Sequence, residues 1–400
     1  MMILFALRRT NKKQFFNTTK NKRGRTAFKT CNFFYMNFQK FFSVIVISFS
    51  FFLTNAQVAP KYSNEFLSLG IGARGLAMSN TMVSLSNDVT AAYWNPAGLA
   101  RMEKPYQLSA MHAEYFAGIA KYDYIGAAYK VDNKHAVAFS WIRFGVDNIM
   151  NTTELIDHQG NLDYNRITFF SAADNAFLLS YAYNFEQVKG LSIGANAKII
   201  RRKIGKFAGA WGFGLDAGIQ YNIKGWQMGA MLKDVTSTFN AWSYNLTDRV
   251  KEVFIETGNE IPSNTLELTI PKLNLGAAKY VELGKGFNGT FALDFDFTFD
   301  GKRNTLIKSK ALNIDPHFGM EFAYKRIVAI RAGIGNFQQV PYFDGKKKFS
   351  CQINLGIGVG IKDIVFIDYA FTDLGDLSVG MYSHVFSLKV AIESFKRKKE

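Results

Sequence analysis

Large apolar side chains alternate with small or polar ones along most of the chain between Tyr106 and Ile392. In residues 211–221 every second position is apolar, and the positions between are glycine, aspartate or glutamine. Residues 290–299 and 349–361 repeat this pattern. Because successive side chains of a strand point to opposite faces, the alternation predicts strands with one large apolar face and one small, polar face.

About fourteen strand-like segments follow residue 105. They lie near 106–116, 119–131, 134–145, 177–185, 191–204, 211–223, 226–236, 273–283, 288–299, 316–325, 327–336, 349–362, 364–372 and 382–392. Most connections are short, but 146–176, 237–272 and 300–315 are long and polar. An even number of strands, apolar outside and polar within, with long loops at one end, is typical of outer-membrane barrels. The sequence therefore predicts an all-β fold, a closed transmembrane antiparallel β-barrel of about 14 strands over residues 106–395.

A soluble β-sandwich or propeller would also alternate. The minor face here is rich in glycine and alanine, whereas a solvent-exposed face normally carries Lys, Glu and Thr. No repeat of roughly 40–50 residues is evident, as a propeller would require. Small inward residues leave room for a plug, and residues 57–105 show no strand alternation. We therefore favour the membrane barrel and expect residues 57–105 to form an N-terminal hatch segment in its lumen.

The beginning of the chain has the features of an export signal. The apolar run 41–53 follows Lys40, and Ala56 offers a small residue for cleavage. Met36 stands at the distance expected for the start of an ordinary signal peptide. We expect residues 1–56 to be leader and signal peptide, with Met36 as the true start and cleavage near Ala56. A basic transit peptide is the alternative.

Charge and cysteine content exclude several classes of function. The net charge of +16 depends on residues 1–56, which hold ten Lys/Arg and no acid, and on a basic tail at 396–400. The remaining chain has 38 basic and 32 acidic residues, so a nucleic-acid partner is not indicated. Only Cys351 follows the leader, which excludes an internal disulfide, and no Cys/His cluster has metal-site spacing.

No motif indicates an active site. Gly70, Gly72 and Gly75 match G-x-G-x-x-G, but a dinucleotide site needs a parallel strand before it and an acid roughly 20 residues later. Asp88 comes too early for that role, so we interpret these glycines as positions of tight packing. G-x-S-x-G and H-E-x-x-H are absent. We predict a non-enzymatic protein without a cofactor or metal.

Charged residues on the minor face of the strands are expected to line the lumen. Asp294 and Asp296 share a face at a spacing of about 7 Å. Paired carboxylates serve glycosidases, but nothing else indicates a sugar site, so we expect these two to meet water or loop amides. The predicted lumenal polar residues are Asp216, Asp294, Asp296, Glu321, Lys325 and Arg331.

Residues 64–102 carry the most specific motifs. These are Phe66-Leu67, Gly72-Ala73-Arg74-Gly75, Asp88-x-x-Ala91 and Trp94-Asn95-Pro96-Ala97-Gly98. The stretch resembles the N-terminal segment of the PorV/PorQ family, a branch of the FadL-like outer-membrane proteins of Bacteroidetes and relatives. Weaker matches occur at 229–234, where relatives often have Asn in place of Asp234, and at 373–375 and 383–384.

The resemblance implies a 14-stranded barrel with a hatch inside. The implied hatch motif comprises Gly72, Arg74, Gly75, Trp94, Asn95, Pro96, Ala97 and Gly98, and we expect Asn95 to cap backbone groups in the lumen. It also implies one of two functions. PorV and PorQ are adaptors of type IX secretion, whereas FadL-type members let hydrophobic molecules diffuse through a gated lumen and a lateral opening.

We expect an adaptor or shuttle of type IX protein secretion and surface attachment in the bacterial outer membrane, because the long polar loops 146–176 and 237–272 suit binding partners. The expected partners are outer-membrane lipid, translocon or attachment-complex proteins and secreted cargo. The alternative is a FadL-like passive transporter, whose partners would be hydrophobic small molecules. A plain structural barrel is the third possibility.

Overall fold

The computed structural model describes residues 63–156, 159–341, 346–375 and 382–393 of the 400-residue chain. The expected leader, signal peptide and basic tail, and residues 57–62 of the expected hatch, lie outside these ranges. Within the described ranges, no helix combines the length and the apolar character needed to cross a membrane.

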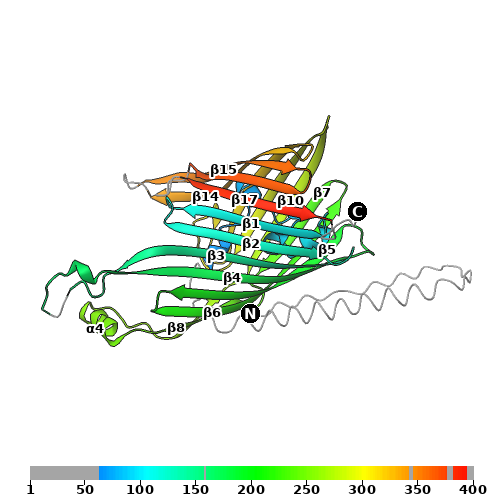
Figure 1. Cartoon of the computed structure of the whole chain (residues 1–400). Coiled ribbons are helices and arrows are strands. Elements are labelled where there is room, and N and C mark those ends of the chain that lie inside the picture. Colours follow the sequence, from blue (N-terminus) through cyan, green and yellow to red (C-terminus); the bar gives the residue numbers. More distant parts are fainter. Residues whose placement is uncertain (1–62, 157–158, 342–345, 376–381, 394–400) are drawn as a thin grey trace, which may run out of the picture. The chain divides into compact units, whose positions relative to one another are not determined.

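Fourteen antiparallel strands form a closed barrel (Figure 1). Pairing of the first strand with the last closes the ring. The strands are β1 (Tyr106–Tyr115), β2 (Ala120–Lys130), β3 (His135–Asn151), β4 (Thr168–Asn184), β5 (Leu191–Ile204), β6 (Ala208–Ile223), β7 (Trp226–Lys233), β10 (Lys272–Gly284), β11 (Phe287–Thr298), β13 (Asn313–Tyr324), β14 (Val328–Pro341), β15 (Lys347–Ile361), β16 (Val365–Leu374) and β17 (Ser383–Ile392). The predicted fold class is confirmed, and each of the fourteen predicted segments overlaps one of these strands.

The alternation along each strand separates an outer from an inner surface. On β6, Phe213 and Leu215 are 46% and 47% exposed, whereas Asp216 is 5% exposed. The large apolar residues therefore point outward, and the small and polar ones point into the barrel. A lipid bilayer favours this arrangement because it offers no hydrogen bonds to polar groups on the outside.

Two of the long connections are shorter than predicted, and two of the three predicted loops contain further strands. β3 and β4 extend into 146–176, and 300–315 contains β12 (Ile307–Lys308) and the start of β13. The segment 237–272 contains β8 (Thr238–Tyr244), α4 (Asp248–Glu256) and β9 (Thr265–Thr269). The alternation of large apolar and small polar residues arises where one face of a strand contacts lipid. Strand ends that extend beyond the bilayer lack this contact, so the alternation does not predict them.

β8 continues the wall where β7 stops. β7 pairs with Ala217–Ile223 of β6, and β8 pairs with Ala208–Phe213 of the same strand. β9 then pairs with β8. The backbone groups of β6 are thus hydrogen-bonded over most of its length, which leaves little of this strand as an unpaired edge in the wall.

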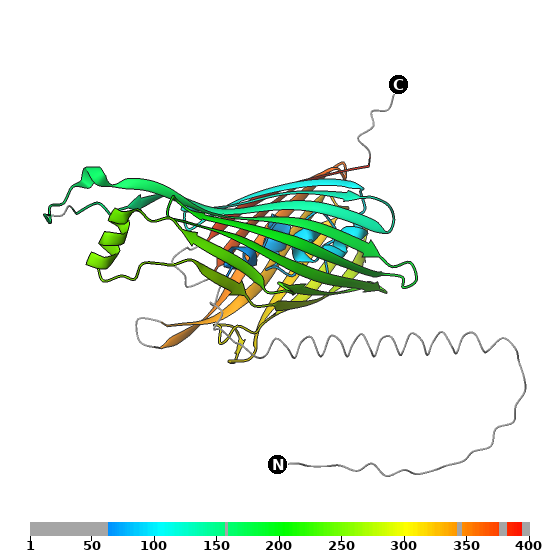
Figure 2. The same cartoon turned by 90° about the horizontal axis from the view of Figure 1, so that it is seen from below.

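The two ends of the barrel differ. The longest connections, 152–167, 234–271 and 299–312, all lie at one end, which we call the upper end. α4 lies there beside the β3–β4 connection (Figure 2), where Arg249 Nη2 donates to Ile156 O at 3.4 Å. At the opposite, lower end, connections such as 224–225 and 285–286 are tight. In outer-membrane barrels the long loops are extracellular.

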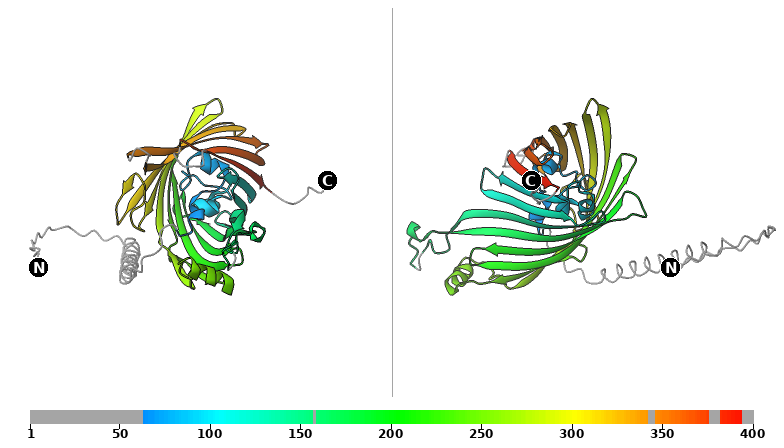
Figure 3. Two further views of the ribbon diagram at one scale, coloured as in Figure 1. Left: turned by 90° about the vertical axis from the view of Figure 1, so that its left-hand side faces the viewer. Right: turned by 45° about the vertical axis from the view of Figure 1, so that its right-hand side comes forward.

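Residues 63–105 pack inside the ring of strands, and we call them the lumenal segment (Figure 3). The segment contains η1 (Glu65–Ser68), α2 (Ala73–Ala77), α3 (Ala91–Trp94) and η2 (Pro96–Arg101). Almost every residue from Gly70 to Ala100 is buried. The core of the molecule is therefore the contact between this segment and the inner wall.

Candidate functional site

The lumenal segment packs against a set of glycines on the inner wall of the barrel. A Cβ built at Gly194 of β5 would come closer than 3.0 Å to the backbone of Pro96, and one at Gly333 of β14 would do the same to the backbone of Met78. Atoms do not approach so closely, so only glycine fits. We call the equivalent positions the glycine band; they are Gly194, Gly218, Gly229, Gly319, Gly333 and Gly356.

The Trp94–Gly98 turn is fixed to two strands by Asn95. The Asn95 Nδ2 donates to the carbonyls of Ile219 on β6 at 3.0 Å and Ala230 on β7 at 3.3 Å. The same amide donates to Val83 O at 2.9 Å, and its Oδ1 accepts from Ala97 N at 3.2 Å. Asn95 thus satisfies backbone groups of the turn, of the lumenal segment and of the wall.

The two parts of the predicted hatch motif lie against each other. The Trp94 Nε1 donates to Ile71 O at 3.2 Å, and a Cβ at Gly75 would come within 3.0 Å of the Trp94 ring. Gly72 precedes α2 with a φ of 76°, which favours glycine. A Cβ at Gly98 would meet the backbone of Ser86. These glycines therefore serve close packing; whether the segment acts as a hatch stays a prediction.

Four charged residues join α2 to three strands in what we call the lower ion network. Arg74 binds Glu321 of β13 with two hydrogen bonds, of 2.9 and 2.8 Å. Arg331 of β14 donates to the same carboxylate at 2.5 Å and to Asp368 of β16 at 2.6 Å. Glu321, Arg331 and Asp368 are all buried, so the two cations and two carboxylates depend on one another.

A second ion pair joins the lumenal segment to the last strand. Lys389 Nζ of β17 donates to Asp88 Oδ2 at 2.6 Å, and Thr90 Oγ1 donates to Asp88 Oδ1 at 2.6 Å. Burial alone would raise the pKa of Asp88, but the Lys389 ammonium and the Thr90 hydroxyl hold it well below its usual range. Asp88 is therefore ionised at neutral pH.

The other predicted lumenal residues have separate roles. Asp216 accepts a hydrogen bond of 3.0 Å from buried Lys198, which also binds Asp234 at 2.5 Å. Asp294 Oδ2 accepts from Val83 N at 2.9 Å, so this carboxylate contacts the lumenal segment. Asp296 accepts from Asn274 nearer the upper end. Asp294 and Asp296 therefore serve different contacts.

The prediction for Lys325 is wrong. Lys325 is exposed in the tight turn between β13 and β14, and its ammonium lies 5.2 Å from the centre of the Tyr324 ring. Its φ of 44° places it outside the regular strand, so strand alternation does not determine its direction. Conversely, the sequence reading missed Lys198, Asp368 and Lys389, although Lys198 and Asp368 occupy inward positions by the same alternation.

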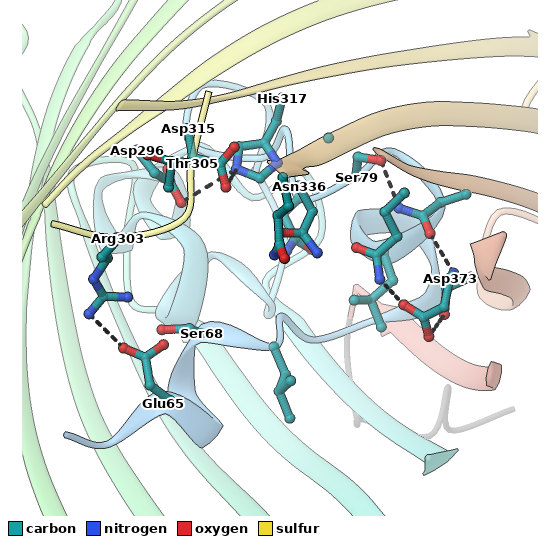
Figure 4. A pocket seen from close by; sticks show the side chains of 18 of the residues that line it. Glu65, Ser68, Ser79, Asp296, Arg303, Thr305, Asp315, His317, Asn336 and Asp373 are labelled. Atoms are coloured by element: carbon teal, nitrogen blue, oxygen red, sulfur yellow. Dashed lines mark hydrogen bonds and ion pairs between the residues drawn. The ribbon is translucent and has the colours of Figure 1, made fainter. Parts of the chain in front are cut away.

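Two cavities lie in the barrel on either side of the lumenal segment. The upper cavity, of about 490 Å³, is lined on the side of the lumenal segment by residues that include Glu65, Ser68 and Ser79 (Figure 4). The lower cavity, of about 520 Å³, is bounded by Arg74, Leu85 and Asn87. The two cavities share no lining residue among the described part of the chain, so the segment divides the lumen.

A third pocket, of about 650 Å³, opens on the outer wall where β17, β1 and β2 meet, and we call it the outer pocket. The outward apolar side chains of its lining are Ala110, Ile125, Trp141, Ile367, Phe386 and Leu388. Asp123 lines it as well, together with His112 and Arg143, its ion-pair partners. Two lining residues also touch α2: Met111 Sδ accepts from Gly72 N at 2.9 Å, and Ser387 Oγ accepts from Ala73 N at 3.1 Å. The outer pocket and the lumenal segment thus share wall residues.

Acidic groups and histidines do not form a metal centre in the described residues, where no set of three or more His, Cys, Asp or Glu could hold an ion. The strongest charge clusters are instead ion pairs between the lumenal segment and the wall.

Comparison with known proteins rests on structure alone. No protein-family model matches the chain. No curated protein sequence matches it either. The monoaromatic hydrocarbon channel CymD is similar with a TM-score of 0.51 and 12% identity, over 82% of this chain and 99% of that one. The Pseudomonas putida toluene transporter TodX matches with a TM-score of 0.51 and 12% identity, over 81% and 98%.

A FadL homologue of Pseudomonas aeruginosa matches with a TM-score of 0.49 and 12% identity, over 80% of this chain and 98% of that one. At such low identity a likeness shows the fold and nothing finer. None of these neighbours tests the resemblance to PorV/PorQ, which stays a prediction. The chain therefore is a closed antiparallel barrel of fourteen strands, and its fold is similar to that of CymD and TodX.

Proposed function

We propose that this chain is a bacterial outer-membrane barrel that lets small hydrophobic molecules pass, with the lumenal segment as its gate. The observation that carries the proposal is the outer pocket, whose apolar lining faces the membrane. Its residues Met111 and Ser387 hold Gly72 and Ala73 of the lumenal segment on the inner side. The similar structures CymD and TodX are described as a hydrocarbon channel and a toluene transporter, which supports the same class of solute.

The route follows from which groups can accept an apolar solute. The upper cavity is lined mainly by carboxylates, amides and hydroxyls, which an apolar molecule would have to desolvate. The outer pocket removes apolar surface from water at no such cost. Movement of α2 away from Met111 and Ser387, together with local separation of β1 from β17, would connect the lumen to this pocket. The expected partners are therefore membrane lipid and hydrophobic small molecules.

A substitution that fills the outer pocket tests this route. We expect Ala110→Trp to slow uptake of toluene into vesicles carrying the purified protein by about tenfold, because the indole occupies the space between Ile125 and Phe386. Ala127→Trp is the matched control, since Ala127 also faces outward on β2 but does not line this pocket. Equal uptake by both variants and the parent protein would refute the route.

A secretion adaptor is the second candidate, and exposed apolar residues at the upper end favour it. Met150 and Phe169, on the extensions of β3 and β4, are 65% and 61% exposed, and Ile255 on α4 is 67% exposed. Apolar side chains beyond the bilayer commonly mark surfaces that bind other proteins. The lumenal segment also separates the two cavities, which fits a barrel whose lumen conducts little.

Replacing residues 247–258, which include α4, with a short Gly/Ser linker tests the adaptor role. We expect the barrel to form normally and toluene uptake to stay unchanged, because α4 contributes nothing to the wall. Under the adaptor proposal, type IX cargo would no longer reach or remain on the cell surface. Normal secretion and attachment in a strain lacking the whole gene would remove this candidate.

A further inference from the structure

The wall of the upper cavity contains a histidine between two carboxylates (Figure 4). His317 Nε2 lies 3.7 Å from Asp296 Oδ2 and 3.8 Å from Asp315 Oδ2. His317 is only 9% exposed, and its Nε2 has no hydrogen-bond partner. Asn274, 8% exposed on β10, which pairs with the strand of Asp296, lines the same cavity. Buried polar atoms without partners are costly, so they indicate where a ligand gains binding energy.

The unpartnered groups are mostly hydrogen-bond acceptors. Asn80 Oδ1 of the lumenal segment, Asn274 Oδ1 of β10 and Asp315 Oδ1 of β13 are all buried without a donor. The three residues come from separate parts of the chain and line one cavity. A ligand that fits must therefore bring several donors.

The charges around the cavity also favour a ligand that donates hydrogen bonds. Its two basic residues, Lys272 and Arg303, both bind Glu65 at 2.9 Å, and Arg303 also binds Asp300. Burial would raise the pKa of Glu65, but these two cations hold it below its usual range. Within the described residues, Asp296 and Asp315 have no lysine or arginine within 4.0 Å. The positive charge of Lys233 on β7 reaches Asp296 only from beyond contact distance. Two carboxylates without a contacting lysine or arginine thus face the cavity next to His317.

We infer that the upper cavity binds a small organic cation through a primary ammonium group. An ammonium supplies three donors and a positive charge in direct contact with the two carboxylates. A cavity of about 490 Å³ accommodates a molecule of this kind. The carboxylates would repel a small anion, and a neutral polyol would bring them no positive charge. The inference goes beyond the proposed passage of apolar solutes and does not rest on it.

The test measures binding to the purified full-length mature protein in detergent micelles by isothermal titration calorimetry. The probes are putrescine, the uncharged 1,4-butanediol of similar length, and succinate. We expect saturable binding of putrescine, at least about tenfold weaker binding of the diol, and no binding of succinate. Added salt should weaken the putrescine signal, since the attraction is ionic. Equal binding of putrescine and the diol, or none of putrescine, would overturn the inference.

Variants locate the site. Asp315→Asn and Asp296→Asn each keep the shape and remove one charge, and we expect each to weaken putrescine binding by about tenfold. Asp147→Asn is the matched control, because Asp147 lies on the outer face of β3, where it pairs with Lys121. Heat-modifiable migration on gels shows that each barrel has folded. If Asp315→Asn fails that check, Asp296→Asn carries the test. Unchanged affinity in a folded cavity variant would place binding elsewhere.

Discussion

Replacing Gly194 with valine is expected to displace the Trp94–Gly98 turn and open the lumen. The α-hydrogen of Gly194 faces the backbone of Pro96 and Ala97, and a Cβ there would come closer than 3.0 Å to them. Backbone atoms cannot move aside as the end of a flexible side chain can. Overpacking of this kind costs about 1–3 kcal/mol, and here it falls on the contact that keeps the turn on β5. We therefore expect a stable barrel with a loosened lumenal segment.

Single-channel conductance in planar bilayers is the direct measurement. We expect channel openings to be at least about tenfold more frequent in Gly194→Val than in the parent protein, because the channel opens when the Trp94–Gly98 turn leaves β5. Gly289→Val is the matched control. Gly289 lies on the outer face of β11, and a Cβ there would make only ordinary contacts, of 3.4 Å or more, with side chains. If both variants conduct alike, the glycine band does not hold the segment in place.

Replacing Glu321 with glutamine is expected to destabilise the protein by about 3 kcal/mol, because removing one partner of a buried ion pair leaves the others uncompensated. Glu321 accepts hydrogen bonds from both Arg74 and Arg331. Glutamine keeps the volume, so the loss comes from charge and hydrogen bonding rather than from a cavity. We expect the lumenal segment to detach before the barrel unfolds, since Arg74 forms its ion pair with β13.

Urea unfolding in lipid vesicles, followed by tryptophan fluorescence, measures this loss. Glu393→Gln is the control: Glu393 pairs with Lys104 at 2.6 Å, but its side chain is 76% exposed, so we expect a nearly unchanged midpoint. A double-mutant cycle with Arg74→Met isolates the Arg74–Glu321 coupling. A coupling energy near zero would show that the two side chains act independently.

The barrel could be predicted because the bilayer constrains every strand in the same way. A strand such as Lys347–Ile361 must be apolar outside, and its inner face is free to be small, so the alternation shows clearly in sequence. Beyond the bilayer this constraint ends. The alternation therefore predicts loops where the structure has the upper parts of β3 and β4 and the short strands β8 and β9.

The sequence indicates which polar residues face the lumen, but it does not indicate which residue each of them contacts. Inward positions of Asp216, Glu321 and Arg331 follow from alternation along their own strands. Glu321 binds Arg74, and Asp294 accepts a hydrogen bond from Val83 N. Both contacts depend on the path of the lumenal segment, whose sequence has no periodicity from which that path could be predicted. The motif at Trp94–Gly98 indicated that this segment is specialised, but its bonds to β6 and β7 required the structure.

Contacts between the lumenal segment and the last strands restrict how the chain can assemble. Ala73 bonds Ser387 across 314 positions, Asp88 bonds Lys389 across 301, and Asn354 bonds Ser79 across 275. Such distant contacts form late and slow folding. A ring that had already joined β1 to β17 would have to admit about 40 residues through its mouth. We therefore expect the lumenal segment to occupy the lumen before β1 pairs with β17, so that closure of the ring is the last step of assembly.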